Sequence, residues 1–532
     1  MLPPTESGMR IRPVLPADEQ PQLHRMAEEV RHILDRLLAG APAATDTRNR
    51  LLDELSWWQD VDDRPLDEAV ERSFLLRQVI LRSAPSDGTW RNALSYIGDP
   101  DPVDEQVCTY DYDRAEIRFA PDSPLARPYA WMRGDGCAVE TWYSRTGMSA
   151  ITAWLIAVAR MAAERGMPHL VLTNRLYHEA EILFDMARLA DVTVRKHDDL
   201  DSLLAAANEA EHPVVIFLDS SRPDGTAAAL TRLLREIDPT KVGSVLWDNT
   251  CASASDSPFE PAGPSWSEAS EAPAAPLPVE PLTLLDLDDD GVGQASTTPR
   301  LRTDELTTTL VVLRSHAKLD QLGLELCSLG SVVMMTGPAN TGEGPHWQTG
   351  MQRFFADSLA VTGACASPAT LRLMASLGLP DESLSRRANR HLRQANALAA
   401  RILIDELTPT GRYQVEENEH GCFVEIHLLE LPGPEPIGGP PTWPVWDELD
   451  RELTRIGEHA AERSIPIWKS ASFGFHYTGL SWYSAEDPPR PQGHAHTVLR
   501  VCFGMHDPAV TAEAAEIIAE HLTRKSSWTP IS

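Results

Sequence analysis

The sequence predicts an α/β protein in which helices cover both faces of a mostly parallel sheet. Between residues 140 and 250, short apolar runs typical of buried strands alternate with amphipathic helical patterns. Strands and helices in this alternation favour parallel strands joined by crossover helices. A helical region precedes this pattern, and a smaller mixture of strands and helices follows it. We therefore expect a large α/β domain, an extra helical N-terminal region and a small α+β C-terminal domain.

The composition fits a multidomain protein and argues against several partners. The chain has 532 residues, 42% of them hydrophobic, which is enough for two or three domain cores. Its 78 acidic and 47 basic residues give a net charge of −31, so we expect no nucleic-acid or membrane partner. No stretch has the length and apolar character of a membrane span or signal peptide. The seven cysteines lack zinc-site spacing, so we expect no metal site and a cytoplasmic location.

Changes in composition along the chain give the expected domain boundaries. The helical N-terminal extension covers residues 1–125, and the large α/β domain covers residues 126–345. A segment rich in Pro, Ala, Ser and Glu, residues 254–282, interrupts the large domain and is expected to be a loosely ordered insertion. Connecting helices follow at 346–400, and the small C-terminal domain occupies residues 401–532.

The individual elements follow from hydrophobic periodicity and from glycine and proline signals. In the N-terminal region, residues 17–83 are mostly helical, and residues 84–125 are rich in Asp and Pro and expected to be irregular. The large domain is expected to contain helices at 146–166, 177–191, 200–211 and 226–238, and strands at 168–174, 192–197, 213–221 and 242–250. Beyond residue 345, helices are expected at 345–405, 445–463 and 508–525, and strands at 422–430, 464–469 and 496–504.

Polar residues at the expected strand ends are the first candidates for a site, because ligands of such sheets bind at the carboxyl ends of the strands. Asp248 follows the buried run "VGSVLW", where a carboxylate needs a cation or a strong donor, although it could instead cap the following turn. Thr146 and Gly147 begin an apolar helix whose N-terminus suits a phosphate, or Thr146 could serve as an ordinary cap. Tyr177 could stack on a flat ligand or simply pack in the core.

Two cations complete the candidate set. Lys318 follows the apolar run "TTTLVVLRS", so it is either a desolvated nucleophile or an ordinary lysine at a strand end. Arg500 lies within the apolar strand "VLRVCFG" and needs a carboxylate or phosphate partner, or else a structural ion pair. A phosphate-binding helix end, an aromatic ring, an aspartate, a lysine and an arginine are together the groups that pyridoxal phosphate requires. The lysine would form the Schiff base, and the aspartate would keep the pyridine nitrogen protonated.

The order of these motifs resembles that of one enzyme family, over residues 140 to 525. The chain looks like a fold-type-I (aspartate-aminotransferase-like) pyridoxal-phosphate enzyme of the cystathionine and methionine, or trans-sulfuration, group. "TGMSAI" is similar to the family's phosphate segment, which assigns Thr146, Gly147 and Met148 to the phosphate. "RLYHEA" resembles its Tyr-Gly-Gly-Thr segment and gives Tyr177 the ring-stacking role. "WDNTCAS" resembles its Asp-Asn-Thr motif, which pairs Asp248 with the pyridine nitrogen.

The C-terminal half of the resemblance supplies the lysine and the substrate residues. "SHAK" stands where the family has Ser-x-Thr-Lys, which implies that Ser315 binds the phosphate and Lys318 is the Schiff-base lysine. "ASFG" resembles the family's Ser-Leu-Gly segment and places Ser472 near the substrate carboxylate. "VLRVCFGMHDP" resembles the segment whose arginine binds the α-carboxylate, a role that falls to Arg500. Family members are oligomers, so the resemblance also implies a homodimer or homotetramer.

Several departures from the family pattern indicate a divergent member. Arg222 stands where the family has an asparagine near the cofactor's phenolic oxygen, and Ala317 replaces a phosphate-binding threonine. The insertion lengthens the interval from Asp248 to Lys318 to 70 residues. The family's Tyr-x-Arg pair, which a neighbouring subunit donates, has no clear counterpart.

The reaction that the resemblance implies is β- or γ-elimination or replacement on an α-amino acid with a leaving group at Cβ or Cγ. Lys318 would move protons at the substrate carbons, with Tyr177 as a second catalytic residue. The divergence favours a role in specialised or unusual amino-acid biosynthesis. The alternatives are an aminotransferase or a carbon–carbon bond-forming enzyme on the same scaffold, and a non-catalytic relative.

Overall fold

The computed structural model describes most of the chain, in separate segments. The described residues are 20–40, 46–61, 64–83, 101–104, 107–109, 137–165, 169–174, 176, 178–187, 192–252, 258–259, 300–338, 344–367, 370–371, 373–374, 377, 382–416, 422–429, 443–470, 474–486 and 495–524. They fall into two compact units. The sheet unit is formed by residues 90–317 and 327–386, and the terminal unit by residues 1–89, 318–326 and 387–532.

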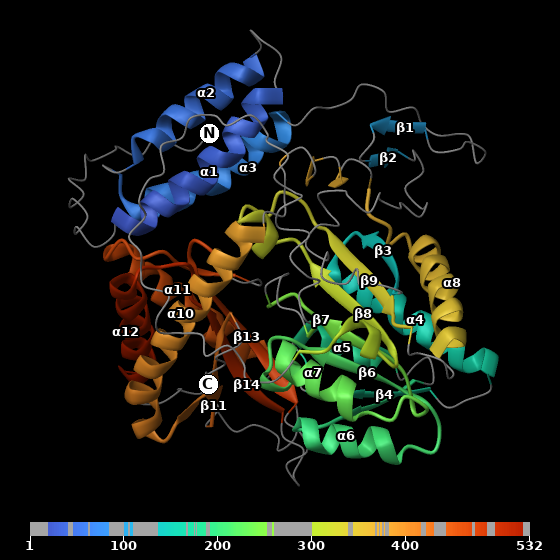
Figure 1. The fold of residues 1–532 in the computed structure, drawn as a ribbon. Coiled ribbons are helices and arrows are strands. Elements are labelled where there is room, and N and C mark those ends of the chain that lie inside the picture. Colours follow the sequence, from blue (N-terminus) through green and yellow to red (C-terminus); the bar gives the residue numbers. More distant parts are fainter. Residues whose placement is uncertain are drawn as a thin grey trace. The chain divides into compact units, whose positions relative to one another are not determined.

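The sheet unit is built on a seven-stranded sheet (Figure 1). Its strands are β3 (Ala138–Ser144), β4 (His169–Thr173), β5 (Val192–Lys196), β6 (Val214–Asp219), β7 (Val242–Asp248), β8 (Thr309–Ser315) and β9 (Gly330–Thr336). They lie in the order β3-β9-β8-β7-β6-β4-β5. The five strands from β8 to β5 are parallel, and β9 runs antiparallel to both β8 and β3. The prediction of an α/β domain built on a mostly parallel sheet is therefore confirmed.

Helices cover both faces of this sheet, and each face has its own apolar core. The helices are α4 (Gly147–Arg165), α5 (His178–Ala187), α6 (Leu200–Glu209), α7 (Ala227–Glu236) and α8 (Gly344–Thr362). On one face of the sheet, every second residue of the strands packs against α4, α5 and α8. On the other face, the intervening strand residues pack against α6 and α7. Because both faces are covered, every position of β6, β7 and β9 is buried, which explains why apolar residues predominate on both sides of these strands.

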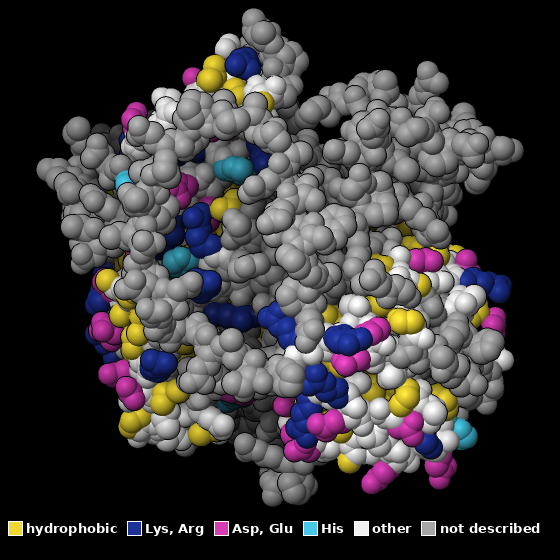
Figure 2. Space-filling model, in the orientation of Figure 1, with side chains coloured by type: hydrophobic (Ala, Val, Ile, Leu, Met, Phe, Trp, Pro, Cys, Tyr) yellow, Lys and Arg dark blue, Asp and Glu magenta, His cyan; other side chains and the backbone are white. Residues whose placement is uncertain are grey.

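The surface over α6 and α7 mixes charges of both signs (Figure 2). Arg232 contacts Asp201 at 2.5 Å and Glu236 at 3.0 Å there. These are exposed pairs, which contribute little to stability but keep this face polar.

The terminal unit contains a five-stranded sheet with helices packed on it. Its strands are β10 (Tyr413–Glu416), β11 (Val424–Leu428), β12 (Ile467–Lys469), β13 (Thr478–Glu486) and β14 (Ala495–Cys502), in the order β10-β11-β14-β13-β12. The helices of this part are α10 (Glu382–Leu407), α11 (Trp443–Glu462) and α12 (Pro508–Arg524). Trp482 on β13 donates its indole N–H to the Leu449 carbonyl of α11, which identifies the face of the sheet that the helix covers.

The N-terminal helices belong to this same unit. They are α1 (Gln20–Gly40), α2 (Asp46–Gln59) and α3 (Leu66–Ser83), and their apolar sides form a common core. The region expected to be irregular contains an antiparallel pair of short strands, β1 (Asp101–Asp104) and β2 (Val107–Thr109). The expected insertion at 254–282 lies almost entirely outside the described residues. Within the described residues of the chain, no helix is both long enough and apolar enough to cross a bilayer.

Candidate functional site

The carboxyl ends of four parallel strands gather polar side chains at one edge of the large sheet. β8, β7, β6 and β4 are neighbours in the sheet, and their ends carry Ser315, Asp248, Asp219 and Asn174. The amide N–H of Asp219 donates to Asn174 Oδ1 at 3.1 Å, which joins β6 to β4. Three of the four are nearly inaccessible, with Asp219 and Asp248 3% exposed and Asn174 1% exposed. Such a cluster is unusual in a core and marks a candidate ligand site.

Asp248 is held by the turn that follows it and faces a second carboxyl group. Thr250 donates to Asp248 Oδ1 twice, from its N–H at 2.9 Å and from its hydroxyl at 2.5 Å. Asp219 is the register partner of Asp248 on the adjacent strand. Burial first, and then the Asp219 charge, raise the pKa of the Asp248 carboxyl well above its ordinary value, although the Thr250 hydrogen bonds and Arg314 oppose this effect. Asp248 therefore caps the turn that follows it, which was one of the two interpretations of its sequence position. A positive charge nearby would in addition stabilise its ionised form.

The turn after Asp248 is fixed by a buried arginine. Arg314, which is fully buried, donates through Nη1 to the carbonyls of Asn249 and Ala252, both at 2.6 Å. The Thr250 hydroxyl also accepts from the Ser315 N–H at 3.0 Å, so the ends of β7 and β8 are tied together. The Asp248 carboxyl and Ser315 are thus held in one rigid frame.

Several buried polar atoms beside this frame find no hydrogen-bond partner within the described parts of the chain. They are the Asn174 Nδ2, the Ser220 Oγ, and the Nδ2 and Oδ1 of Asn249. The three residues are at most 2% exposed. Buried polar atoms are nearly always hydrogen-bonded, so these orphaned atoms indicate that a polar ligand completes the site.

The N-terminus of α4 meets the end of β8 in a close approach that requires glycine. A Cβ on Gly147 would lie 2.9 Å from the Ser315 Cβ, and a Cβ on Gly330 would lie 2.7 Å from the Thr146 carbonyl. Thr146 Oγ1 accepts from the Ser149 N–H at 2.9 Å, so its side chain serves as the helix cap. Met148 packs its side chain on the core, which leaves only its main chain for a ligand. The amides of the first helical turn, beside the Ser315 side chain, fit a phosphate group.

The other residues predicted for the cofactor are only partly described. Arg222 is 5% exposed, and its Nη2 donates to the Leu176 carbonyl at 3.4 Å. Its guanidinium thus reaches the segment that leads to Tyr177. Tyr177 itself and Ser472 lie outside the described residues.

Lys318 begins a tight turn in the terminal unit. The turn spans residues 318–326, and the Lys318 carbonyl accepts from the N–H groups of Gln321 at 3.1 Å and Gly323 at 2.9 Å. Lys318 is 6% exposed, and its Nζ lies 2.5 Å from Glu325 Oε1 and 5.6 Å from the centre of the Tyr477 ring. This lysine is therefore buried and ion-paired, unlike a solvated lysine at a strand end.

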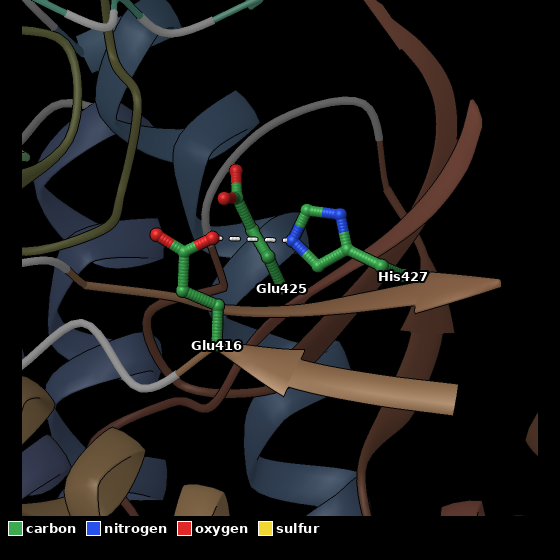
Figure 3. A group of neighbouring side chains, drawn as sticks. All are labelled: Glu416, Glu425 and His427. Carbon is green, nitrogen blue, oxygen red and sulfur yellow. Dashed lines mark hydrogen bonds and ion pairs between the residues drawn. The ribbon is translucent and has the colours of Figure 1, made fainter. Parts of the chain in front are cut away.

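Arg500 and Trp482 lie on opposite faces of the five-stranded sheet. Its register partner on β11 is Glu425, and its guanidinium carbon lies 5.9 Å from the Tyr483 ring centre. The Tyr483 hydroxyl donates to Glu425 Oε1, and His427 Nε2 lies 3.2 Å from Glu416 Oε2 (Figure 3). Directly opposed residues on antiparallel strands are close neighbours, so Glu425 offers Arg500 a carboxylate from within the protein.

Glu416, Glu425 and His427 also lie close together (Figure 3). One potential ligand atom from each of them lies within 4.8 Å of the others. Other charged and polar side chains of the same sheet lie next to this group. Arg500 stands opposite Glu425, and Tyr483 donates to it. We therefore interpret the group as polar side chains that bond to one another and to Tyr483 on the strands beside Arg500.

The structure thus gathers part of the predicted set and adds residues that the sequence reasoning did not single out. Within the sheet unit, Thr146, Gly147, Ser315 and Asp248 are connected by the contacts described above. The additional residues are Asn174, Asp219, Ser220, Asn249 and Thr250. Their signal was present in the strand-end motifs "TN", "LDSS" and "WDNT", but nothing in the sequence tells which side chains lack an internal partner. Glu325 had no sequence signal.

Comparisons with known proteins find similarity to solved structures only. No protein-family model matches the chain, and no curated protein does. A serine palmitoyltransferase from Sphingomonas wittichii is 11% identical, with a TM-score of 0.41, and the match covers 84% of this chain and 83% of that one. A methionine gamma lyase from Micromonospora echinospora is 17% identical, with a TM-score of 0.42 and coverage of 83% and 98%. An O-acetylhomoserine sulfhydrylase from Wolinella succinogenes is 14% identical, with a TM-score of 0.38 and coverage of 71% and 91%.

Proposed function

We propose that the chain binds pyridoxal phosphate at the carboxyl edge of the large sheet and acts on an α-amino acid with a leaving group at Cβ or Cγ. The observation that carries the proposal is the pair of buried carboxyl groups, Asp219 and Asp248, beside orphaned polar atoms and a helix N-terminus. A ligand that is cationic at one end and anionic at the other complements this arrangement. A protonated pyridine ring with a phosphate is such a ligand.

The roles of the residues follow from their chemistry. When bound, pyridoxal phosphate supplies an aldehyde that condenses with amines and a ring that accepts electrons. Asp248 would hold the proton on the ring nitrogen, and the first amides of α4 and the Ser315 hydroxyl would bind the phosphate. Lys318 would supply the amine and move protons at Cα and Cγ of the substrate. Arg500 would bind the substrate α-carboxylate, in competition with Glu425.

The first experiment tests cofactor binding by visible absorbance. Purified protein mixed with pyridoxal phosphate should acquire a visible band that persists after gel filtration and is lost in Lys318→Ala. Lys469→Ala is the matched control, because Lys469 is an exposed lysine of the same unit paired with Asp450. A band of equal intensity in Lys318→Ala would exclude Lys318 as the attachment point, and a colourless wild type would contradict the proposal.

The second experiment tests the reaction. γ-Elimination converts O-acetylhomoserine and water into 2-oxobutanoate, ammonia and acetate, and each product is measurable. Release of ammonia and acetate in equal amounts supports elimination. Formation of a keto acid without ammonia, together with conversion of the cofactor to its amine form, would instead favour transamination. The absence of any product with O-acylhomoserines and vinylglycine would contradict β- or γ-chemistry.

A further inference from the structure

The N-terminal helices contact the turn that carries Lys318 through a short chain of buried polar groups. His476 lies in the segment before β13, and its Nε2 donates to the Leu322 carbonyl within the Lys318 turn at 3.0 Å. Glu29 of α1 approaches the same imidazole, with its Oε2 3.9 Å from His476 Nε2. Both side chains are at most 5% exposed. All of these groups belong to the terminal unit.

The turn depends on this support because its backbone is unfavourable. Leu322 has φ 52°, Gly323 has φ 73° and Glu325 has φ 45°, so two residues with side chains occupy the left-handed region. Each such non-glycine residue costs on the order of 1 kcal/mol and persists only where its surroundings enforce it. A Cβ on Gly323 would lie 2.4 Å from the Phe475 ring, so the residue before His476 packs directly on the turn.

Helix α1 is in turn fixed to the other side of this segment. The N–H of Gln22 donates to Asp507 Oδ2 at 3.0 Å, and Arg25 Nη2 donates to Asp507 Oδ1 at 2.8 Å. Gln22 also contacts His506, whose Nε2 lies 3.0 Å from the Thr478 hydroxyl. The N–H of Met505 donates to the Phe475 carbonyl at 2.6 Å. The loop that contains Phe475 and His476 is therefore held between α1 and the Lys318 turn.

We propose that His476 is a positioning residue that holds the Lys318 turn in its strained conformation, and that Glu29 of the N-terminal helix α1 controls this hold through its own charge. The value of this turn as the carrier of a nucleophile rests on the proposed function, whereas the connection from α1 to the turn does not. The proposal gives a role to residues 20–83, which lie outside the region that resembles a known family.

The protonation states explain why the connection works near neutral pH. Burial lowers the pKa of His476 to about 4, helped by the charges of Lys318 and Arg25, so the ring is neutral. The Leu322 carbonyl can only accept, so Nε2 carries the single ring proton. Burial raises the pKa of Glu29 to about 8, with Arg387 and Arg25 opposing the effect and Glu28 adding to it. At pH 7 Glu29 is therefore a neutral acid, so it does not compete with the Leu322 carbonyl for the hydrogen bond from His476 Nε2.

This arrangement predicts an alkaline transition. Above about pH 8 the ionised Glu29 carboxylate lies beside the His476 N–H and competes with the Leu322 carbonyl for it. The groups that face the Glu29–His476 pair are Arg25, Glu28, Arg387, His506 and Lys318. Loss of the His476–Leu322 bond should then release the turn.

Hydrogen exchange of the turn amides, measured by mass spectrometry on cofactor-free protein, tests the proposal. At pH 7, His476→Ala should speed exchange in a peptide covering residues 318–326 about fivefold to tenfold, the effect of losing one hydrogen bond. His476→Gln, whose amide can donate from a similar position, should restore most of the protection. Unchanged exchange in His476→Ala would overturn the proposal, as would equal loss of protection in the Gln variant.

The pH series keeps the test decisive if His476→Ala does not fold. In wild type, protection of the turn should fall as the pH rises through about 8, after correction with an unstructured peptide of the same sequence. Glu29→Gln should remove that fall. Glu28→Gln is the matched control on the same helix and should retain it. A fall that persists in Glu29→Gln would overturn the role of Glu29. Because no cofactor is present, the outcome is independent of whether the protein binds pyridoxal phosphate.

Discussion

At the scale of single residues, Asp248 is the side chain whose environment most constrains the ligand. Two carboxyl groups on adjacent buried strand ends repel each other, so the pair favours either a shared proton or a cationic partner. A ligand that brings a protonated nitrogen relieves this repulsion, and its binding and the ionisation of Asp248 support each other.

Replacement of Asp248 by Asn should therefore impair the proposed reaction while leaving the turn largely intact. The amide can still accept from Thr250, but it carries no charge to hold a proton on a heterocyclic nitrogen. We expect kcat/KM for elimination to fall about a hundredfold or more, the range of losses for a buried electrostatic group. Asp238→Asn is the control, because Asp238 is an exposed aspartate that also caps a turn, through Thr240. Equal activities of the two variants would contradict the role of Asp248.

Gly147 permits a second test at this scale. Gly147→Ala would push a methyl group to within 2.9 Å of the Ser315 Cβ, so the end of β8 must move away from α4. We expect at least about a tenfold loss of affinity for pyridoxal phosphate in an equilibrium titration, with a loss of stability of about 1–3 kcal/mol. In contrast, Gly457→Ala on α11 has 3.4 Å of room and should be neutral or stabilising. Unaltered cofactor affinity in Gly147→Ala would contradict a phosphate at this helix end.

At the scale of elements, helix α1 depends on one carboxylate for its attachment. Asp507 accepts from the Gln22 N–H and from Arg25, and its side chain is only 10% exposed. Asp507→Ala should lower the unfolding free energy by about 2–4 kcal/mol, because it leaves a mostly buried arginine without this partner. Denaturant unfolding measures the effect. Asp450→Ala, which removes the exposed pair with Lys469, should change stability by less than about 1 kcal/mol. Similar losses in both variants would show that Asp507 has no special role.

Strands and helices with strong local patterns were predictable from the sequence, and those specified by distant partners were not. The strands β6, β7 and β8 are mainly apolar on both faces because both faces are buried, which is visible in the sequence itself. The edge strand β3 has mixed burial, so its pattern is weak, and it pairs with β9 almost two hundred residues away. The turn after Lys318 has left-handed residues without the Asn or Gly that normally signal them, apart from Gly323.

The site residues divide in the same way. Asp248, Ser315 and Lys318 stand out because charged or hydroxyl groups follow apolar runs. Asn249 and Asn174 also stand at strand ends, but a sequence does not reveal which buried amides lack an internal partner. The pairing of Glu425 with Arg500 depends on the register of β11 and β14, which no local pattern specifies.

At the scale of the whole molecule, stability should depend on pH through three buried groups of the terminal unit. The pKa of Glu29 is raised from 4.5 to about 8 by burial, so its contribution is fully present below about pH 4.5 and is lost as the pH rises to 8. His476 and His506 behave oppositely, because burial lowers their pKa values from 6.5 to about 4 and about 3. Their contributions are present above about pH 6.5 and are lost as the pH falls toward 3.

The difference in unfolding free energy between wild type and Glu29→Gln isolates the contribution of the Glu29 carboxyl group to the pH dependence. Relative to the variant, wild type should lose stability between about pH 4.5 and 8, by up to roughly 5 kcal/mol for a fully buried acid. Urea unfolding at a series of pH values measures the difference curve. A flat curve, or one that rises with pH, would contradict burial of Glu29 in its neutral form.

The contact between Gln22 and Asp507 joins residues 485 positions apart, so the order in which the ribosome makes the chain acquires a consequence. Helix α1 leaves the ribosome long before the surface that receives it has been made. At about 5–20 residues per second, the apolar side of α1 waits on the order of tens of seconds for that surface. During translation this helix must be covered by its neighbours α2 and α3 or by a chaperone, and a nascent chain released early would expose it.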